Sequence, residues 1–435
     1  MNVNEINLLL LNGKIENDEL WPNLTALASH PIQFPFEFEL KELPLDPGLI
    51  TIRGARQYGK STWLELHLKK TIERFGSGSA FYLNGDVLAS IEDLYAKAKE
   101  LHGLYSPQAP VKRLFIDEIT AIPEWQKAIK RLIDEGLFRD TLIITTGSKA
   151  SDLRHGSERL PGRKGKLEKS DYLFLPLSFK HFSEKASGKF GPDTWKAYLL
   201  TGGSPVACRE IIEKGILPEY FIQLIKDWIF GEIVASGRNR TALTQLIQCI
   251  FEFGGTPVGF AKLAREAGLA NNTVASGYVE QLGDCLSVLP SWPMEGNKKT
   301  FQFRKPCKFH FINLAVAIAL DSSQIRSIAG FDALPEKRQA ILLEWLVAQE
   351  LWRRQVLANV ENPEAIGFWT SKEHEIDFAL PTREFIEVKR GRAGPMDFGW
   401  FAQSFPKDRL KVICTTPFET AQIKGMTMNE FLLGD

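Results

Sequence analysis

A glycine-rich turn between an apolar strand and a helix is the feature that most constrains this sequence. In GLITIRGARQYGKSTWLELHLKK, the residues Gly54, Gly59, Lys60 and Ser61 fit the pattern G-x-x-x-x-G-K-[ST]. Glycines let backbone N–H groups turn inward, and the N-terminus of the helix that follows attracts an anion. The segment therefore predicts a phosphate-binding loop.

The loop predicts ATP and Mg²⁺ as cofactors. Lys60 would reach the β- and γ-phosphates and take part in catalysis, and the Ser61 hydroxyl would ligate Mg²⁺. The alternative, a plain glycine turn before a surface helix, is disfavoured by the apolar strand that precedes it. The predicted nucleotide-binding residues are Gly54, Ala55, Arg56, Gln57, Tyr58, Gly59, Lys60, Ser61 and Thr62.

Carboxylates and hydroxyls end two further apolar strands. In KRLFIDEITAIPEW, Asp117 would hold Mg²⁺ and Glu118 would act as the general base on the attacking water. The alternative is an acidic cap on the next helix, which is disfavoured downstream of a phosphate-binding loop. In TLIITTGSKAS, Ser148 or Thr146 could position water, but an ordinary turn explains these residues equally well.

Strands and amphipathic helices alternate between residues 48 and about 180. This alternation predicts a mostly parallel sheet covered on both faces, the α/β fold of a P-loop domain over residues 47–184. An accessory N-terminal segment, residues 1–46, would contain a short strand at Phe34–Leu40. The expected strands are Leu49–Arg53, Ala80–Asn84, Arg113–Asp117, Thr141–Thr145 and Tyr172–Leu175, with helices at 61–75, 87–101 and 123–135.

Residues 185–328 are expected to form a helical and winged-helix region. A helix at 241–253 precedes a helix–turn–helix pattern in KLAREAGLANNTVASGYVEQL, and Lys298–Phe311 alternates like a wing. Such a module could bind nucleic acid, or it could serve only for packing between domains. The candidate contacts are Asn271, Asn272, Thr273, Ser276, Lys298, Lys299, Arg304 and Lys305.

Residues 329–435 are expected to form a separate α/β domain. A long helix, Ala333–Val356, precedes strands at Gly367–Trp369, Ile376–Leu380, Phe385–Lys389 and Lys411–Cys414. On these elements Asp377, Glu387 and Lys389 read as D…E-x-K, with Glu344 on the helix. Such carboxylates can bind Mg²⁺ while a lysine orients water, so Glu344, Asp377 and Glu387 with Lys389 form a second candidate metal site. Charges on an exposed strand face are the alternative, and cleavage of nucleic acid stays open.

Charge and cysteine usage limit the choice of partners. Lys plus Arg equals Asp plus Glu at 53 each, so bulk electrostatic adhesion to nucleic acid or to an anionic membrane is not expected. The 5 cysteines include no CxxC pair and read as reduced thiols of a cytoplasmic protein. No stretch is apolar enough to predict a membrane span.

Several segments together resemble bacterial and archaeal ATPases of the AAA superfamily, in which a P-loop domain precedes a long C-terminal region of poorly known function. They are GARQYGKST, FIDEITAIPEWQKAIKRLID, TTGSKASDL, LPGRKGK, FLPLSFKHF, GGSP, LLEWLVAQEL, FWTSKEHEIDFAL and FIEVKRG. The resemblance runs from about residue 46 to the end of the sequence. It implies a sensor-like role for Ser148 and a switch arginine at Arg163. It also implies a homo-oligomer, in which Arg163 or Arg159 would reach a neighbour's site, and a C-terminal domain like the PD-(D/E)xK nucleases.

Two functions are consistent with these features. The leading hypothesis is an ATP-driven or ATP-gated machine that acts on nucleic acid, with DNA as the candidate partner. The alternative is a nucleotide-dependent switch that binds a protein partner, with a C-terminal domain that is a non-catalytic scaffold.

Overall fold

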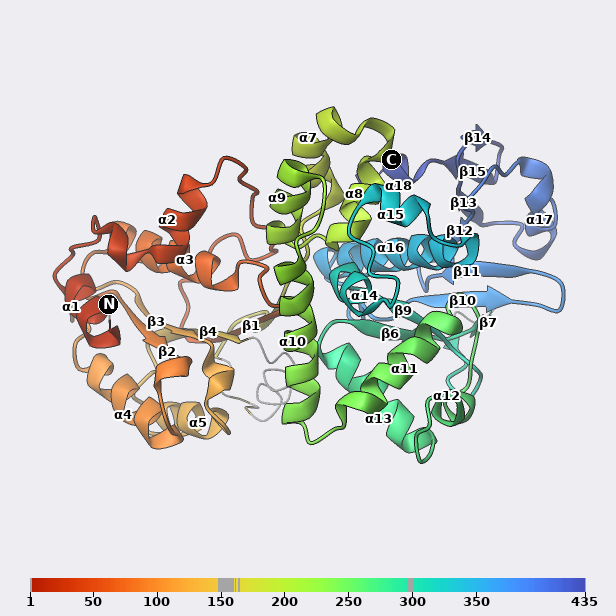
Figure 1. Cartoon of the computed structure of the whole chain (residues 1–435). Coiled ribbons are helices and arrows are strands. Elements are labelled where there is room, and N and C mark those ends of the chain that lie inside the picture. Colours follow the sequence, from red (N-terminus) through yellow and green to blue (C-terminus); the bar gives the residue numbers. More distant parts are fainter. Residues whose placement is uncertain (1, 148–159, 161, 163–164, 296–299, 435) are drawn as a thin grey trace. The chain divides into compact units, whose positions relative to one another are not determined.

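The computed structural model describes residues 2–147, 160, 162, 165–295 and 300–434 (Figure 1). These residues divide into two compact units, Met1–Leu175 and Pro176–Asp435. The first unit combines the N-terminal segment with the expected ATPase domain. It ends before α7 (Phe179–Phe190), because the Phe179 and Phe182 rings pack on Tyr198 of α8 (Thr194–Thr201) in the second unit.

The first unit is built on a parallel sheet with the strand order β2-β3-β4-β1-β5. In Figure 1, α3 lies on one face of this sheet and α4 and α5 lie on the other. The expected strands and helices of this domain are confirmed to within a few residues. Their bounds are β1 Gly48–Gly54, α3 Lys60–Phe75, β2 Ala80–Asn84, η2 Gly85–Val87, α4 Ile91–His102, β3 Lys112–Asp117, η3 Ile119–Ala121, α5 Gln126–Asp134, β4 Thr141–Gly147 and β5 Asp171–Phe174.

The N-terminal segment forms helices α1 (Val3–Leu11), η1 (Asp18–Leu20) and α2 (Pro22–Ser29). The strand predicted at Phe34–Leu40 is wrong, since these residues form no regular secondary structure. Pro35 lacks the N–H that a strand ladder needs. The alternating aromatic residues that suggested a strand instead pack on the domain, with Phe36 against Phe174 and Phe38 against Trp63.

Helix α1 closes the edge of the sheet through Asn7. The Asn7 carboxamide accepts from Tyr82 N and donates to Tyr82 O, each at 2.8 Å. Tyr82 lies in β2, the edge strand, so the side chain supplies the two hydrogen bonds that another strand would make. Edge strands with unpaired backbone groups invite association with other chains, and α1 therefore covers a vulnerable edge.

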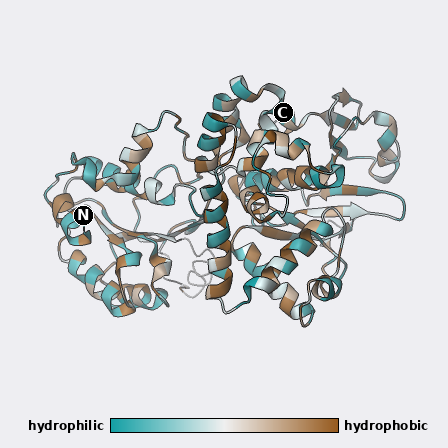
Figure 2. Ribbon diagram, in the orientation of Figure 1, coloured by the Kyte–Doolittle hydropathy of each residue, from teal (hydrophilic) through white to brown (hydrophobic). Residues whose placement is uncertain are grey.

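The second unit begins with a run of helices whose ribbons carry teal and brown bands in Figure 2, as helices with one buried face should. Two short strand pairs, β6–β9 and β7–β8, accompany them. The bounds are α8 Thr194–Thr201, α9 Pro205–Lys214, α10 Glu219–Ala235, α11 Arg240–Glu252, α12 Phe260–Glu266, α13 Asn272–Asp284, β6 Val288–Ser291, β7 Met294–Glu295, β8 Thr300–Phe301, β9 Lys308–Phe311, α14 Leu314–Leu320, α15 Ile328–Asp332 and α16 Glu336–Leu357.

The GGSP segment makes a close turn between α8 and α9. Gly202 has φ +56°, and a Cβ added there would lie 2.1 Å from the backbone nitrogen of Ala315 in α14. At Gly203, with φ +74°, a Cβ would lie 2.7 Å from the Leu177 carbonyl oxygen. Both positions require glycine, for the backbone conformation and for the space.

A mixed sheet completes the chain, in the order β10-β11-β12-β13-β15-β14. Strands β12, β13 and β15 run parallel, while β10–β11, β11–β12 and β14–β15 pair antiparallel. Four strands and the long helix were expected; β14, β15, α17 and α18 were not. The bounds are β10 Gly367–Thr370, β11 Glu375–Ala379, β12 Glu384–Val388, η5 Pro395–Phe398, α17 Phe401–Ser404, β13 Arg409–Ile413, β14 Phe418–Glu419, β15 Ile423–Met426 and α18 Met428–Leu433.

Two sequence expectations concern the whole chain. All five cysteines are buried free thiols. Among the helices that the structure describes, none is both long enough and apolar enough to span a bilayer.

Candidate functional site

The phosphate-binding loop connects β1 to α3, as the sequence predicts. Positive φ angles at Gln57 (64°) and Gly59 (99°) bend the loop into the kind of turn in which backbone N–H groups can converge on an anion. At Gly54, a Cβ would lie 2.7 Å from the Cβ of Phe174, because β5 pairs directly with β1. Glycine at position 54 is therefore required by the packing of the sheet as well as by the loop.

Lys60 begins α3 and is buried beneath the loop. Its Nζ donates to the carbonyl oxygens of Gly54 and Ala55, each at 2.9 Å. The loop thus folds around the ammonium group, which gives the loop a local positive charge. This arrangement can stabilise a polyphosphate.

Asp117, at the end of β3, meets Thr146 of β4 and Ser61 of α3. The Thr146 hydroxyl donates to Asp117 Oδ1, and the Ser61 side chain is hydrogen-bonded to the same carboxylate. Burial raises the pKa of Asp117, while these two hydrogen bonds and the charge of Lys60 oppose the shift. Neighbouring parallel strands and the loop helix thus gather three oxygen-bearing side chains at one edge of the sheet.

The Ser61 and Asp117 oxygens fit a magnesium ion. Hydroxyl and carboxylate oxygens are the hard donors that Mg²⁺ prefers, and phosphate oxygens and water usually complete its octahedron. Within the described part of the chain, no group of three or more His, Cys, Asp or Glu side chains could hold a metal ion. A nucleotide-linked magnesium needs no such group.

Glu118 follows Asp117 in a left-handed backbone conformation, with φ 48°. Its N–H donates to Asp117 Oδ1 and to Thr146 Oγ1, each at 3.2 Å. Its carbonyl lies against Gly85, where an added Cβ would be only 2.3 Å from the Glu118 oxygen. Three elements therefore hold the Glu118 backbone in place at the end of β3.

Thr146, one of the two candidate water-positioning residues, thus contacts Asp117. The other candidate, Ser148, lies outside the described residues, as do Arg163 and Arg159. Their predicted sensor and arginine-finger roles stay predictions.

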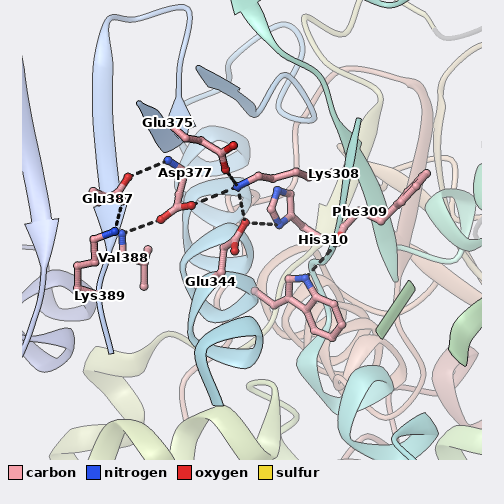
Figure 3. A network of polar contacts seen from close by, with 10 residues as sticks. Lys308, Phe309, His310, Glu344, Glu375, Asp377, Glu387, Val388 and Lys389 are labelled. Carbon is pink, nitrogen blue, oxygen red and sulfur yellow. Dashed lines mark hydrogen bonds and ion pairs between the residues drawn. The ribbon is translucent and has the colours of Figure 1, made fainter. Parts of the chain in front are cut away.

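The C-terminal carboxylates also come together, around a residue that the sequence analysis missed (Figure 3). Lys308 of β9 is fully buried, and its Nζ lies 3.3 Å from Glu344 Oε1 and 3.2 Å from Asp377 Oδ1. Lys389 Nζ lies 2.5 Å from Glu387 Oε1. A metal-binding role for Glu344, Asp377 and Glu387 stays a prediction that this geometry does not favour.

The expected helix–turn–helix residues lie on α12, α13 and the turn between them. Asn272, Thr273 and Ser276 of α13 are exposed. Asn271 is also exposed, but its side chain accepts from Val274 N and caps the helix. Arg304 and Lys305 are exposed between β8 and β9, whereas Lys298 and Lys299 lie outside the described residues.

Comparison with known proteins gives one family match and several distant likenesses. Residues 46–183 match a family model described as an AAA domain. The uncharacterized protein MJ1544 of Methanocaldococcus jannaschii is 26% identical over 371 residues, which cover 80% of this chain and 76% of that protein.

Among solved structures, the Walker-type ATPase PABY2304 of Pyrococcus abyssi is 14% identical, with 62% of this chain and 90% of that chain covered and a TM-score of 0.41. The Aeropyrum pernix ORC1 protein in complex with DNA is 15% identical, with 65% and 88% covered and a TM-score of 0.33. Both likenesses are too distant to indicate a function for this chain.

The family match coincides with the parallel sheet, the loop at Gly54–Thr62 and the Asp117–Glu118 strand end. Over residues 46–183, the chain carries an AAA-type P-loop ATPase domain.

Proposed function

We propose that this protein binds ATP with Mg²⁺ at Gly54–Thr62 and hydrolyses it with Glu118 as the general base. The observation that carries the proposal is the meeting of Lys60, Ser61, Asp117 and Thr146 at one edge of the sheet. Magnesium, held by Ser61 and Asp117, would neutralise charge on the phosphates. Steady-state ATP turnover by the full chain tests this proposal.

In this mechanism the chain's own residues position the reactants. The loop N–H groups and Lys60 hold the β- and γ-phosphates, and Thr146 fixes the Asp117 carboxylate through its hydroxyl. Glu118 accepts a proton from the attacking water, for which it must lie at a fixed distance from the γ-phosphate. The hydrogen bonds that the Glu118 N–H donates to Asp117 Oδ1 and Thr146 Oγ1 set that position.

Gly85→Ala should slow turnover about 10- to 100-fold and leave ATP affinity almost unchanged, because a small displacement of a catalytic group can cost that much. The new methyl group would sit 2.3 Å from the Glu118 carbonyl oxygen and push that residue away. The three atoms nearest the added Cβ belong to Glu118 and Ile119 and not to Lys60 or the loop, so binding should survive. Turnover and nucleotide affinity, measured on one preparation, check this expectation.

The control is Gly188→Ala in α7, where nothing lies within 4 Å of an added Cβ. Equal turnover by the Gly85→Ala variant and the parent chain would mean that the Glu118 backbone position is not required.

We further propose that the ATPase acts on DNA, which α13 and the segment between β8 and β9 would contact. The order α11, α12, α13, β6 and β9 supports a winged helix. Asn272, Thr273 and Ser276 offer exposed polar side chains for base edges. Phe303 is 66% exposed and precedes Arg304 and Lys305, which could meet phosphates.

The Arg304→Ala/Lys305→Ala double variant should bind duplex DNA more weakly than the parent chain at every sequence. If each cation neutralises one phosphate, the slope of log affinity against log salt should fall by about 2 in magnitude. Fluorescence anisotropy over a salt series, with and without a non-hydrolysable ATP analogue, measures both quantities.

Lys214→Ala is the matched control, since Lys214 is an exposed cation on α9 that pairs with Glu210. An unchanged salt slope in the double variant, or no DNA binding by the parent chain in either nucleotide state, would exclude this surface as the DNA site.

The C-terminal sheet supports a nuclease-like fold. Helix α16 is followed by the antiparallel strands β10, β11 and β12, then by α17 and by β13, which runs parallel to β12. Asp377 and Glu387 lie on adjacent strands of this sheet, as the D…E-x-K pattern requires. A fold of this kind does not by itself carry cleavage.

The second candidate function is a nucleotide-dependent switch that binds a protein partner, with the C-terminal domain as a scaffold. The specific observation that favours it is the buried ion network around Lys308. A homo-oligomer in which Arg163 reaches a neighbour's nucleotide would serve either function.

A further inference from the structure

A buried lysine lies at the centre of the C-terminal carboxylate cluster. Lys308 is 0% exposed, and its Nζ lies 2.6 Å from Glu375 Oε1 in addition to its contacts with Glu344 and Asp377. Figure 3 shows the ammonium group between these three side chains. The lysine comes from β9, whereas the carboxylates come from α16 and β11.

The carboxylate oxygens of Asp377 and Glu387 also accept hydrogen bonds from the protein. Asp377 Oδ2 accepts from Val388 N at 2.9 Å, and Glu387 Oε2 accepts from Asp377 N at 3.1 Å. Glu387 Oε1 accepts from Lys389 at 2.5 Å. Each oxygen of the Asp377–Glu387 pair therefore has a donor from the protein itself.

The carboxylates around Lys308 keep its ammonium group protonated. Burial lowers the pKa of Lys308, but the charges of Glu344, Asp377 and Glu375 outweigh this effect and raise the pKa above its ordinary value. Burial raises the pKa of Glu344 to about 7, against the opposing charge of Lys308. His310, whose pKa burial lowers to about 3, adds no positive charge.

A divalent ion would have to enter beside this ammonium group. Two cations a few ångströms apart repel strongly in a buried site, where the effective dielectric constant is far below that of water. A buried lysine left without its carboxylates would in turn be costly. Metal binding and the Lys308 contacts therefore compete for the same oxygens.

We propose that Lys308 is the resident cation of this cluster, filling the place that a divalent metal takes in a metal-dependent nuclease centre. The C-terminal domain then works without metal and without cleaving nucleic acid. The ammonium group also ties β9 to α16 and β11, alongside the bond from Trp345 Nε1 to the Phe309 carbonyl at 3.1 Å. The proposal is independent of ATP hydrolysis.

The test is Mn²⁺ binding by the full chain without nucleotide, measured by electron paramagnetic resonance and calorimetry. Every chain carries Asp117→Asn, which removes the carboxylate ligand of the nucleotide site. The chain with Lys308 intact should show no saturable Mn²⁺ binding that depends on Asp377, and no Mn²⁺-dependent cleavage of DNA. Adding Lys308→Ala should create one Mn²⁺ site per chain, which a further Asp377→Asn should remove.

Lys411→Ala is the matched control, because Lys411 pairs with Glu384 at 2.7 Å on the same sheet but is one-third exposed. This variant should gain no Mn²⁺ site. Binding of Mn²⁺ by the chain with Lys308 intact, lost on Asp377→Asn, would overturn the proposal. So would a folded Lys308→Ala variant that binds no Mn²⁺.

Loss of a buried charge partner can prevent folding, so refolding of the Lys308→Ala variant is measured as well. If the Lys308→Ala variant folds only when Mn²⁺ is present, the added ion has replaced the ammonium group and the proposal holds. If it stays unfolded at saturating Mn²⁺, the cluster does not accept a free cation and the proposal fails. Circular dichroism during refolding, with and without Mn²⁺, separates these outcomes.

Discussion

Glu118→Gln should bind ATP as tightly as the parent chain and hydrolyse it about 10²- to 10⁴-fold more slowly, the usual contribution of a general base. The substitution keeps the size of the side chain and its backbone hydrogen bonds to Asp117 and Thr146. It removes only the ability to accept a proton. Lys60→Ala should instead lose ATP binding, since it removes the cation that the loop encloses.

Nucleotide affinity by calorimetry and turnover by phosphate release separate these two effects. Glu124→Gln is the control, since Glu124 lies on the same segment but is exposed and pairs with Lys127 at 2.5 Å. Parental turnover by the Glu118→Gln variant would show that another group activates the water. Loss of affinity in that variant would instead assign Glu118 to binding.

Gly202→Ala should destabilise the second unit by about 2–5 kcal/mol. About 1–2 kcal/mol comes from placing a side chain in the left-handed region, and about 1–3 kcal/mol from overpacking. The new methyl group would meet the Ala315 backbone nitrogen at 2.1 Å, and backbone cannot rotate away as a side chain can. This loss is a large share of the stability of an ordinary domain.

Calorimetric unfolding of the full chain measures the effect, with ATP binding as a check that the first unit remains folded. Gly231→Ala in α10 is the control, because Gly231 is exposed and an added Cβ meets nothing within 4 Å. That substitution should be neutral or stabilising by up to about 1 kcal/mol, since alanine favours a helix interior. An unfolding temperature for Gly202→Ala equal to that of the parent would mean that α8 and α14 can separate at little cost.

The ATPase domain was predictable because its signals are local. Strands buried on both faces are continuous apolar runs, and β4 is buried at every residue. The glycine pattern of the loop lies at the end of β1, and the Asp117–Glu118 pair lies at the end of β3. Once these strands are recognised, both motifs can be placed at the same edge of the sheet. The contact between Thr146 and Asp117 was harder to foresee, since the apolar run at 141–145 is followed in the sequence by two hydroxyl residues, Thr146 and Ser148, and the sequence does not say which one meets Asp117.

The errors arise where contacts are distant in sequence. Phe36 and Phe38 alternate as in a strand, yet their partners Phe174 and Trp63 decide their conformation. Lys308 was missed because a lysine so close to the exposed Arg304 and Lys305 is expected to face solvent. Lys308 and His310 alternate with Phe309 and Phe311, which indicates a strand with one polar face. The pattern does not reveal that this polar face is buried as well, as all four residues of β9 are.

The hydrogen bonds at the β2 edge of the first sheet limit where the ATPase domain can be truncated. The family match begins at residue 46, but the Asn7 carboxamide supplies the last pair of hydrogen bonds to β2. Glu65 of α3 likewise accepts from the backbone N–H groups of Asn23 and Leu24, at the start of α2. A polypeptide started at residue 46 would keep every proposed catalytic residue and yet leave the edge of β2 without the Asn7 hydrogen bonds. Such molecules would tend to join edge to edge, and their self-association could be mistaken for the proposed homo-oligomer.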